Sequence, residues 1–318
     1  PTVAWGSIWI APVVAVLVLT VARAIRRLTR WVDRGLGRFL PARLAQTVGF
    51  VLVALAVYWV ATGVVFSGFV SFADSVYGAS NQETDPGVTQ PSQPERSGSP
   101  ASLVAWDTLG RQGRTFAGGG PTVSELSTMS GRPAQEPIRV YVGVDSAPTA
   151  DERAALAVRE LERTGAFDRS VLVVAGATGT GWLEPQSTDS LEYLWNGDSA
   201  IATIQYSFLP SWISFLVDQE RATDAGIALF DAVHAAWAER PESARPKLVV
   251  YGLSLGSFAA QAPFSSAADL AARTDGALFM GSPDLSQPWG QITAGRDAGS
   301  PEWQPVVDAG HTVRFGTD

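Results

Sequence analysis

A short serine motif with a glycine on each side is the part of the sequence best suited to do chemistry. The run Gly252, Leu253, Ser254, Leu255, Gly256 is a G-x-S-x-G pattern that follows KLVVY and precedes SFAAQAPF. In a nucleophile elbow the serine occupies a tight strand-to-helix turn, where a Cβ at either glycine would crowd neighbouring backbone. The pattern predicts Ser254 as a nucleophile. The alternative is a glycine-rich strand-to-helix turn with no catalytic role.

An elbow serine also needs backbone N–H groups to hold the oxyanion. One comes from the residue after the serine, here Leu255, and another from the loop after an earlier strand. The loop GATGTGW at 176–182 follows the predicted strand two before the elbow strand. Its glycines permit close approach of backbone to a ligand, so we expect Ala177 or Thr178 to supply the second donor. The alternatives are a flexible turn or a phosphate-binding nest, although G-x-x-G-x-G lacks the spacing of the dinucleotide fingerprint.

The elements that must position this site are alternating strands and helices. Helical periodicity is found over 151–164 and 214–240. Alternation of this kind predicts an α/β fold with a doubly wound, mostly parallel sheet, whose ligands bind at the carboxyl ends of the strands. The predicted strands are 138–144, 170–175, 200–206, 247–251 and 276–280.

Composition and charge exclude several classes of function. The chain has 318 residues, no Cys and a net charge of −8, which divides into +5 on residues 1–77 and −13 on residues 78–318. Such an acidic part is a poor partner for nucleic acid, and two histidines rule out a His-rich metal site. We expect no cofactor and no metal. The only Lys is Lys247 against 22 Arg, a bias typical of a high-GC bacterium.

The first 77 residues have the pattern of a membrane region. Residues 3–22 carry no charge, and neither do residues 44–73. Twenty such residues span the roughly 30 Å hydrocarbon core of a bilayer, so we expect transmembrane helices at about 3–22 and 44–66. The seven arginines between them predict a cytoplasmic loop, which puts the following domain outside the cytoplasmic membrane. The alternatives are buried helices of a soluble protein or a signal peptide.

The rest of the chain divides into a tether and a domain. Residues 78–101 are rich in Gly, Pro, Ser, Gln and Thr, which predicts a flexible tether or surface loop. Residues 102–318 are long enough for one substantial core. Because the chain begins at Pro1 and its only Met residues are Met129 and Met280, we expect it to be a piece of a longer protein.

Four segments of the chain together are specific enough to indicate a family. They are SLVAWDTLGRQGRTF (102–116), ATGTGWLEP (177–185), LEYLWNGDSAIATIQYSFLPSWISFLVDQERA (191–222) and VYGLSLGSFAAQAPFS (250–265). On these segments the chain resembles the actinobacterial membrane-anchored α/β-hydrolases, in which a multi-helix membrane region precedes an extracytoplasmic hydrolase domain. The resemblance covers nearly the whole chain and implies Ser254 as the nucleophile of an esterase, lipase or acyltransferase.

The resemblance also implies that the domain is incomplete, because family domains continue beyond residue 318 and take their acid and histidine from later strands. Within the chain, the order serine, acid, histidine leaves Asp284 and His311 as triad candidates. Otherwise Asp284 decorates a loop and His311 belongs to a surface turn. The second histidine, His234, shares a helix face with Phe230 and Trp237, which indicates packing.

We therefore expect a membrane-anchored serine hydrolase or acyltransferase that acts on an ester outside the cytoplasmic membrane through an acyl-enzyme, with the lipid bilayer as its partner. Large aromatic side chains in the loops form either an apolar acyl pocket, which would suit a lipid or lipid-linked ester, or ordinary core packing. A catalytically inactive hydrolase-fold module that binds or scaffolds in the cell envelope is the alternative. The aromatic residues are Trp182, Trp195, Tyr206, Phe208, Trp212 and Trp289.

Overall fold

The computed structural model describes residues 16, 19–20, 22–32, 34–35, 41–59, 63, 66–301 and 303–316. The chain forms two compact units, Pro1–Phe72 and Ala73–Asp318. The predicted serine motif and both of its predicted donor loops belong to the second unit.

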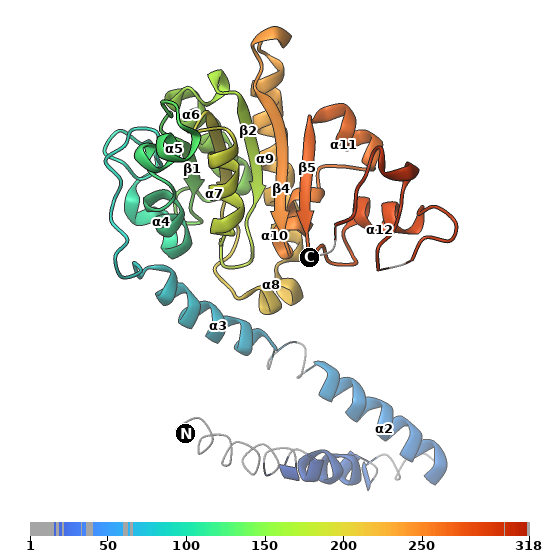
Figure 1. Ribbon diagram of the computed structural model, residues 1–318. Coiled ribbons are helices and arrows are strands. Elements are labelled where there is room, and N and C mark those ends of the chain that lie inside the picture. The colour runs from blue at the N-terminus through green and yellow to red at the C-terminus, as the bar shows by residue number, and fades with distance from the viewer. Residues whose placement is uncertain are drawn as a thin grey trace, which may run out of the picture. The chain divides into compact units, whose positions relative to one another are not determined.

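A five-stranded parallel sheet forms the centre of the second unit (Figure 1). The strand order is β1-β3-β2-β4-β5, so the strand before the elbow, β4, pairs directly with the strand before the glycine-rich loop, β2. The predicted parallel α/β sheet is confirmed, and strand ends differ from the predicted ones by at most two residues. The strands are β1 (Ile138–Val142), β2 (Val171–Gly176), β3 (Ser199–Ile204), β4 (Lys247–Leu253) and β5 (Gly276–Met280).

Helices cover both faces of this sheet. On one face α9 (Gln219–Ala238) packs against α6 (Ala150–Thr164) and α10 (Leu255–Gln261). The connections β1 to β2, β3 to β4 and β4 to β5 all run toward the β5 edge of the sheet, whereas the connection from β2 to β3 runs toward the β1 edge. Because such connections are right-handed, the helix of this one, α7 (Pro185–Leu194), lies on the other face. There α7 contacts β3 and α5, and α4 contacts β1. The remaining helices are α4 (Gly110–Gly118), α5 (Val123–Ser130), α8 (Ser211–Val217), α11 (Ala267–Arg273), α12 (Gln287–Ala294), and the 3-10 turns Trp106–Thr108, Ala166–Asp168, Glu242–Ala244 and Asp308–Gly310.

Local sequence signals account for the helix ends. Helix α6 begins at a capping box in which the Thr149 hydroxyl accepts from the Glu152 amide, and Glu152 in turn accepts from the Thr149 amide. It ends at Gly165, whose φ of 70° is the left-handed conformation that glycine adopts without strain. Strands β1, β2 and β3 are buried on both faces, as their largely apolar runs indicate, whereas β5 at the edge of the sheet is mostly exposed.

The long helix predicted over 214–240 is two helices. Helix α8 ends at Val217, and α9 begins at Gln219. Asp218 between them has a φ of −120°, outside the helical region, and its buried carboxylate accepts a 2.6 Å hydrogen bond from the Ser207 hydroxyl. This bond to a distant loop holds the break, and helical periodicity alone does not reveal it.

The segment predicted as a flexible tether is instead packed against the domain. Helix α3 (Phe66–Asn81) extends into it, and Arg96 forms a 2.7 Å ion pair with Glu136 while pairing in a bridge with Arg139 of β1. The backbone amide of Ser97 donates to the Arg139 carbonyl at 2.9 Å. Polar side chains and hydrogen bonds to the edge of the sheet therefore hold residues 82–101. The prediction of a flexible tether considered only the low apolar content of the segment, which does not reveal these polar contacts.

The described part of the first unit contains α2 (Ala42–Trp59) and the beginning of α3. Most of the predicted helix 3–22 lies outside the described residues. The predicted helix 44–66 is covered in part by α2, which ends at Trp59, and α3 starts at Phe66. Among the described residues, none of the helices combines the length and the hydropathy that crossing a bilayer requires.

Candidate functional site

Ser254 occupies a strained turn between β4 and α10. Its φ of 53° and ψ of −123° are rare for a residue with a side chain, and such a conformation costs of order 1–3 kcal/mol. Its amide donates to the Met280 carbonyl at 2.8 Å, and its carbonyl accepts from the Phe258 amide at 3.1 Å. The neighbours of Ser254 along the chain are at least partly buried, whereas Ser254 itself is exposed. The turn therefore presents the hydroxyl at the surface.

Both glycines of the motif are required by close backbone contacts. A Cβ at Gly252 would lie 2.5 Å from the Cα of Ser257, in the first turn of α10. A Cβ at Gly256 would collide with the carbonyl oxygen of Gly176 and lie 3.2 Å from the carbonyl carbon of Ala177. The first contact makes the turn tight. The second brings the end of β2 against the start of α10.

This second contact places the predicted oxyanion donors near each other. Leu255 is the first residue of α10, where amides have no partner within the helix, and Ala177 directly follows β2 at the contact. Thr178 is the next residue, but its amide donates to the Trp182 carbonyl at 3.1 Å. The Thr178 amide is thus engaged inside its own loop, and Ala177 is the better placed of the two candidates.

Asp284 lies in the loop between β5 and α12, on the elbow side of the sheet because the Ser254 amide bonds to the last residue of β5. Its side chain is exposed, and no hydrogen bond or ion pair within the described residues engages its carboxylate. The loop itself is anchored to α10. Ser282 contacts the buried Ser257 hydroxyl at 2.6 Å, and the buried Gln261 amide donates to Ser282 at 2.9 Å.

Neither histidine is joined to Ser254 by a hydrogen bond in the part of the chain that the structure describes. His311 is exposed, and its Nδ1 lies 2.9 Å from the carbonyl oxygen of Asp308, three residues earlier. It belongs to a turn that an antiparallel bridge between Val307 and Val313 closes. His234 packs between Phe230 and Trp237 of α9, with ring centroids 5.5 and 5.6 Å away.

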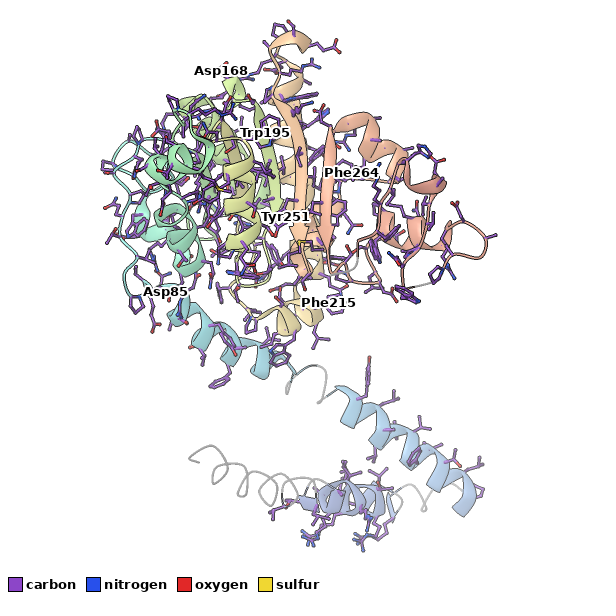
Figure 2. The ribbon with its side chains drawn as sticks, in the orientation of Figure 1. Asp85, Asp168, Trp195, Phe215, Tyr251 and Phe264 are labelled. Carbon is purple, nitrogen blue, oxygen red and sulfur yellow. The ribbon has the colours of Figure 1, made fainter. Side chains whose placement is uncertain are left out.

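The aromatic side chains of the loops are divided among different surroundings. Tyr206 and Trp195 pack in the main core, whereas Phe208 packs in a second cluster with Leu209 and Ala73. The end of the sheet that carries the elbow can be followed in Figure 2, where Tyr251 of β4 and Phe215 of α8 lie toward it and Asp168 lies at the opposite end.

A cavity of about 440 Å³ lies on the flank of α10, and none of these aromatic residues lines it. Helices α9, α10 and α12, the segment after α10 and the β5–α12 loop line it. Because Ser254 is not among its lining residues either, we do not assign this cavity as the acyl pocket. Its walls include Ile227, Phe258, Phe264 and Leu285.

The sequence interpretation missed two residues that hold the glycine-rich loop. The Tyr141 hydroxyl donates to the Gly181 carbonyl at 2.8 Å, and the Gln205 side-chain amide donates to the Thr180 carbonyl at 3.1 Å. Both side chains are fully buried. The sequence offers one signal for these two residues, a polar side chain inside or next to an apolar strand. This signal does not show which loop carbonyl the side chain binds.

The packing of His234 has a consequence for stability. Burial lowers the pKa of His234, and the charge of Arg273 lowers it further; Asp231 raises it by less than either, and Arg245 adds the smallest lowering effect. The unfolded chain, with a histidine pKa of about 6.5, then binds the proton more tightly than the folded one. The stability due to neutral His234 is present above that pH and is lost as the pH falls through the lower folded pKa.

We therefore expect the melting temperature to fall between pH 7.5 and pH 5 by more in the wild type than in His234→Phe, which keeps the ring stacking. Thermal unfolding of both proteins at the two pH values measures this. An equal fall in both would show that His234 does not contribute.

Comparisons with known proteins agree with this architecture. A model described as "Alpha/beta-hydrolase family" matches residues 138–318, which is more than half of the chain, and a model described as "Alpha/beta-hydrolase family N-terminus" matches residues 2–121. No curated protein and no solved structure matches the chain significantly. The chain belongs to the alpha/beta-hydrolase family.

Proposed function

We propose that the protein is a serine hydrolase of the esterase, lipase or acyltransferase type, with Ser254 as its nucleophile. The conformation of Ser254 is the observation that carries this proposal. An exposed serine at a φ of 53° between two glycines that cannot accept a Cβ is a costly arrangement, and it has no purpose in packing. In a nucleophile elbow, such a conformation serves catalysis because it exposes the serine hydroxyl at the top of the sheet, beside the amide of the next residue.

In this mechanism the Ser254 Oγ attacks the ester carbonyl, and the leaving alcohol departs from a tetrahedral intermediate to give an acyl-enzyme. The amides of Leu255 and Ala177 would stabilise the oxyanion, each contributing on the order of 3 kcal/mol to transition-state binding. Water or an acceptor alcohol then removes the acyl group. Of the two triad candidates in the chain, Asp284 is better placed than His311, because its loop is anchored to α10 next to the elbow.

We further propose that residues 1–77 anchor the hydrolase domain to the cytoplasmic membrane with the domain outside, and that the ester substrate is lipid or lipid-linked. The uncharged run 44–73 and the arginine-rich segment before it support the anchor and its orientation. The same resemblance that suggests this arrangement suggests an actinobacterial source.

A second candidate is a catalytically inactive hydrolase fold that binds or scaffolds in the cell envelope. The specific observation in its favour is that, within the described residues, no hydrogen bond connects Ser254 to an imidazole and His311 is bonded in its own turn. Reactivity of Ser254 separates the two candidates.

Labelling of the full-length protein with a fluorophosphonate probe tests the proposal. We expect covalent labelling of the wild type and no labelling at position 254 in Ser254→Ala, because alanine has no hydroxyl to attack the phosphorus of the probe. The matched control is Ser265→Ala, which removes an exposed serine beyond the end of α10 and should label like the wild type. Labelling that persists in Ser254→Ala, or no labelling of the wild type, would contradict the proposal.

A competing alcohol then separates a hydrolase from a transferase. A transferase yields the new ester of that alcohol, and a hydrolase yields the free acid.

A further inference from the structure

Residues 177–182, which form most of the loop between β2 and α7, have their backbone fixed by hydrogen bonds within the loop and to the rest of the domain. Internally, the Thr178 amide donates to the Trp182 carbonyl at 3.1 Å and the Gly181 amide donates to the Thr178 carbonyl at 2.8 Å. These two bonds leave the carbonyls of Thr180 and Gly181 to be satisfied by the rest of the domain. Both carbonyls accept a hydrogen bond from a buried side chain, one on β1 and one directly after β3.

Tyr141 of β1 holds the Gly181 carbonyl. Its hydroxyl donates to the Gly181 carbonyl at 2.8 Å, and burial raises the pKa of Tyr141, so it remains a donor throughout the accessible pH range. Gly181 has a φ of 86°, and a Cβ there would collide with that hydroxyl and lie 2.9 Å from the Gln205 Cγ. The glycine therefore permits both the loop conformation and the close approach of the two donors.

Gln205, directly after β3, holds the Thr180 carbonyl. Its Nε2 donates to the Thr180 carbonyl at 3.1 Å, and its Oε1 accepts from the Val144 amide at 3.3 Å. The same Nε2 lies 3.1 Å from the Oδ1 of buried Asn81, the last residue of α3. One fully buried side chain thus joins the end of α3, the end of β1 and the glycine-rich loop.

We propose that Tyr141 and Gln205 are positioning residues that hold the loop 177–182 so that the Ala177 amide points at the oxyanion formed on Ser254, with Asn81 keeping Gln205 in place. This inference rests on the proposed function. Neither side chain touches the reacting atoms. They fix the two peptide planes on either side of Gly181, in a loop that contains Gly179 and Gly181 and would otherwise sample many conformations.

Two conservative variants test this in the full chain. Tyr141→Phe removes only the hydroxyl, and Gln205→Met keeps the length of the side chain but removes both of its polar groups. The matched control is Thr203→Val. Thr203 lies on β3 beside Tyr141 in the register and is equally buried, but its hydroxyl has no hydrogen-bond partner among the described residues.

Hydrogen exchange of the amides in 177–182 measures how often the loop opens, and fluorophosphonate labelling measures the reactivity of Ser254. We expect at least about a tenfold faster exchange in Tyr141→Phe and Gln205→Met, but not in Thr203→Val. The maximal rate of inactivation should fall by about 10- to 100-fold, while the probe concentration for half-maximal rate changes by less than about twofold, because a misplaced donor weakens the transition state rather than probe binding.

Loop exchange and probe labelling test different parts of the proposal. Unchanged loop exchange in both variants would overturn the positioning role, whether or not Ser254 reacts. Faster exchange with an unchanged inactivation rate, or a loss confined to probe binding, would overturn its link to the oxyanion. A wild type that is not labelled at all would overturn the proposed function and this link with it.

Discussion

Replacing Glu192 with alanine is expected to lower the free energy of unfolding by about 3 to 5 kcal/mol, because it leaves the buried guanidinium of Arg139 without its main counter-charge. Glu192 of α7 is completely buried, and its two carboxylate oxygens accept from Nε and Nη2 of Arg139, each at 2.7 Å. Burial alone would lower the pKa of Arg139, but Glu192 and Asp189 hold it above its ordinary value. The guanidinium therefore stays charged and cannot escape the penalty by losing a proton.

Other contacts of Arg139 do not replace this carboxylate. Nη2 also bonds to Asp189 at 2.6 Å, but Asp189 is one-third exposed and engages a single nitrogen. Nη1 donates to the Phe116 carbonyl at 2.9 Å, a neutral acceptor. The bidentate pair thus connects β1 to α7 and, through Phe116, to α4.

Urea unfolding followed by tryptophan fluorescence measures the loss. The matched control is Asp231→Ala, which breaks the 2.6 Å ion pair with Arg273 at the surface and should cost about 1 kcal/mol or less. The double variant Arg139→Met with Glu192→Leu should recover most of the loss, since replacing a buried ion pair with apolar side chains is often neutral. A loss in Glu192→Ala no larger than that of Asp231→Ala would show that the pair is not desolvated.

The strands could be predicted from the sequence because each is a short apolar run between turn residues. Residues 276–280 were predicted with the observed ends, and 138–144 was predicted two residues too long because Gly143 and Val144 continue the apolar pattern past the last ladder pair of β1. The elbow was equally accessible, since a strand, two glycines and a helix are all local features. A local sequence pattern does not show which remote residue a side chain will contact.

The buried charges illustrate this limit. Arg139 stands inside the apolar run IRVYV, and its partner Glu192 is 53 residues later. Glu160 of α6 is also fully buried, and it accepts from the amides of Leu103 and Val104 in the segment that follows the predicted tether. In both cases the sequence predicts an exposed charged residue, but the side chain is buried and forms hydrogen bonds with a remote segment. The sequence therefore predicts Ser254 as the nucleophile, but it does not predict the interactions that hold the loops around it.

Replacing Gly256 with alanine is expected to remove at least about 99% of the labelling rate at Ser254 while leaving the chain folded. The new Cβ would meet the Gly176 carbonyl oxygen and carbonyl carbon, the latter at 3.1 Å, and backbone cannot rotate away as a side chain can. Either the end of β2 or the start of α10 must move. A displacement of about 1 Å at this contact separates the Ala177 and Leu255 amides from the oxyanion, and misplacement of that size costs about 100-fold in rate.

The expected cost in unfolding free energy is about 1–3 kcal/mol, as for other overpacked sites. Gly276→Ala is the matched control. Gly276 begins β5 in the same sheet, but a Cβ there has nothing within 4 Å, so this variant should label and unfold like the wild type. Gly176→Ala should reproduce the loss from the opposite side, because its Cβ would collide with the Gly256 carbonyl oxygen. Because the two glycines form one contact, wild-type labelling rates in either variant would show that the approach of β2 to α10 does not position the oxyanion donors.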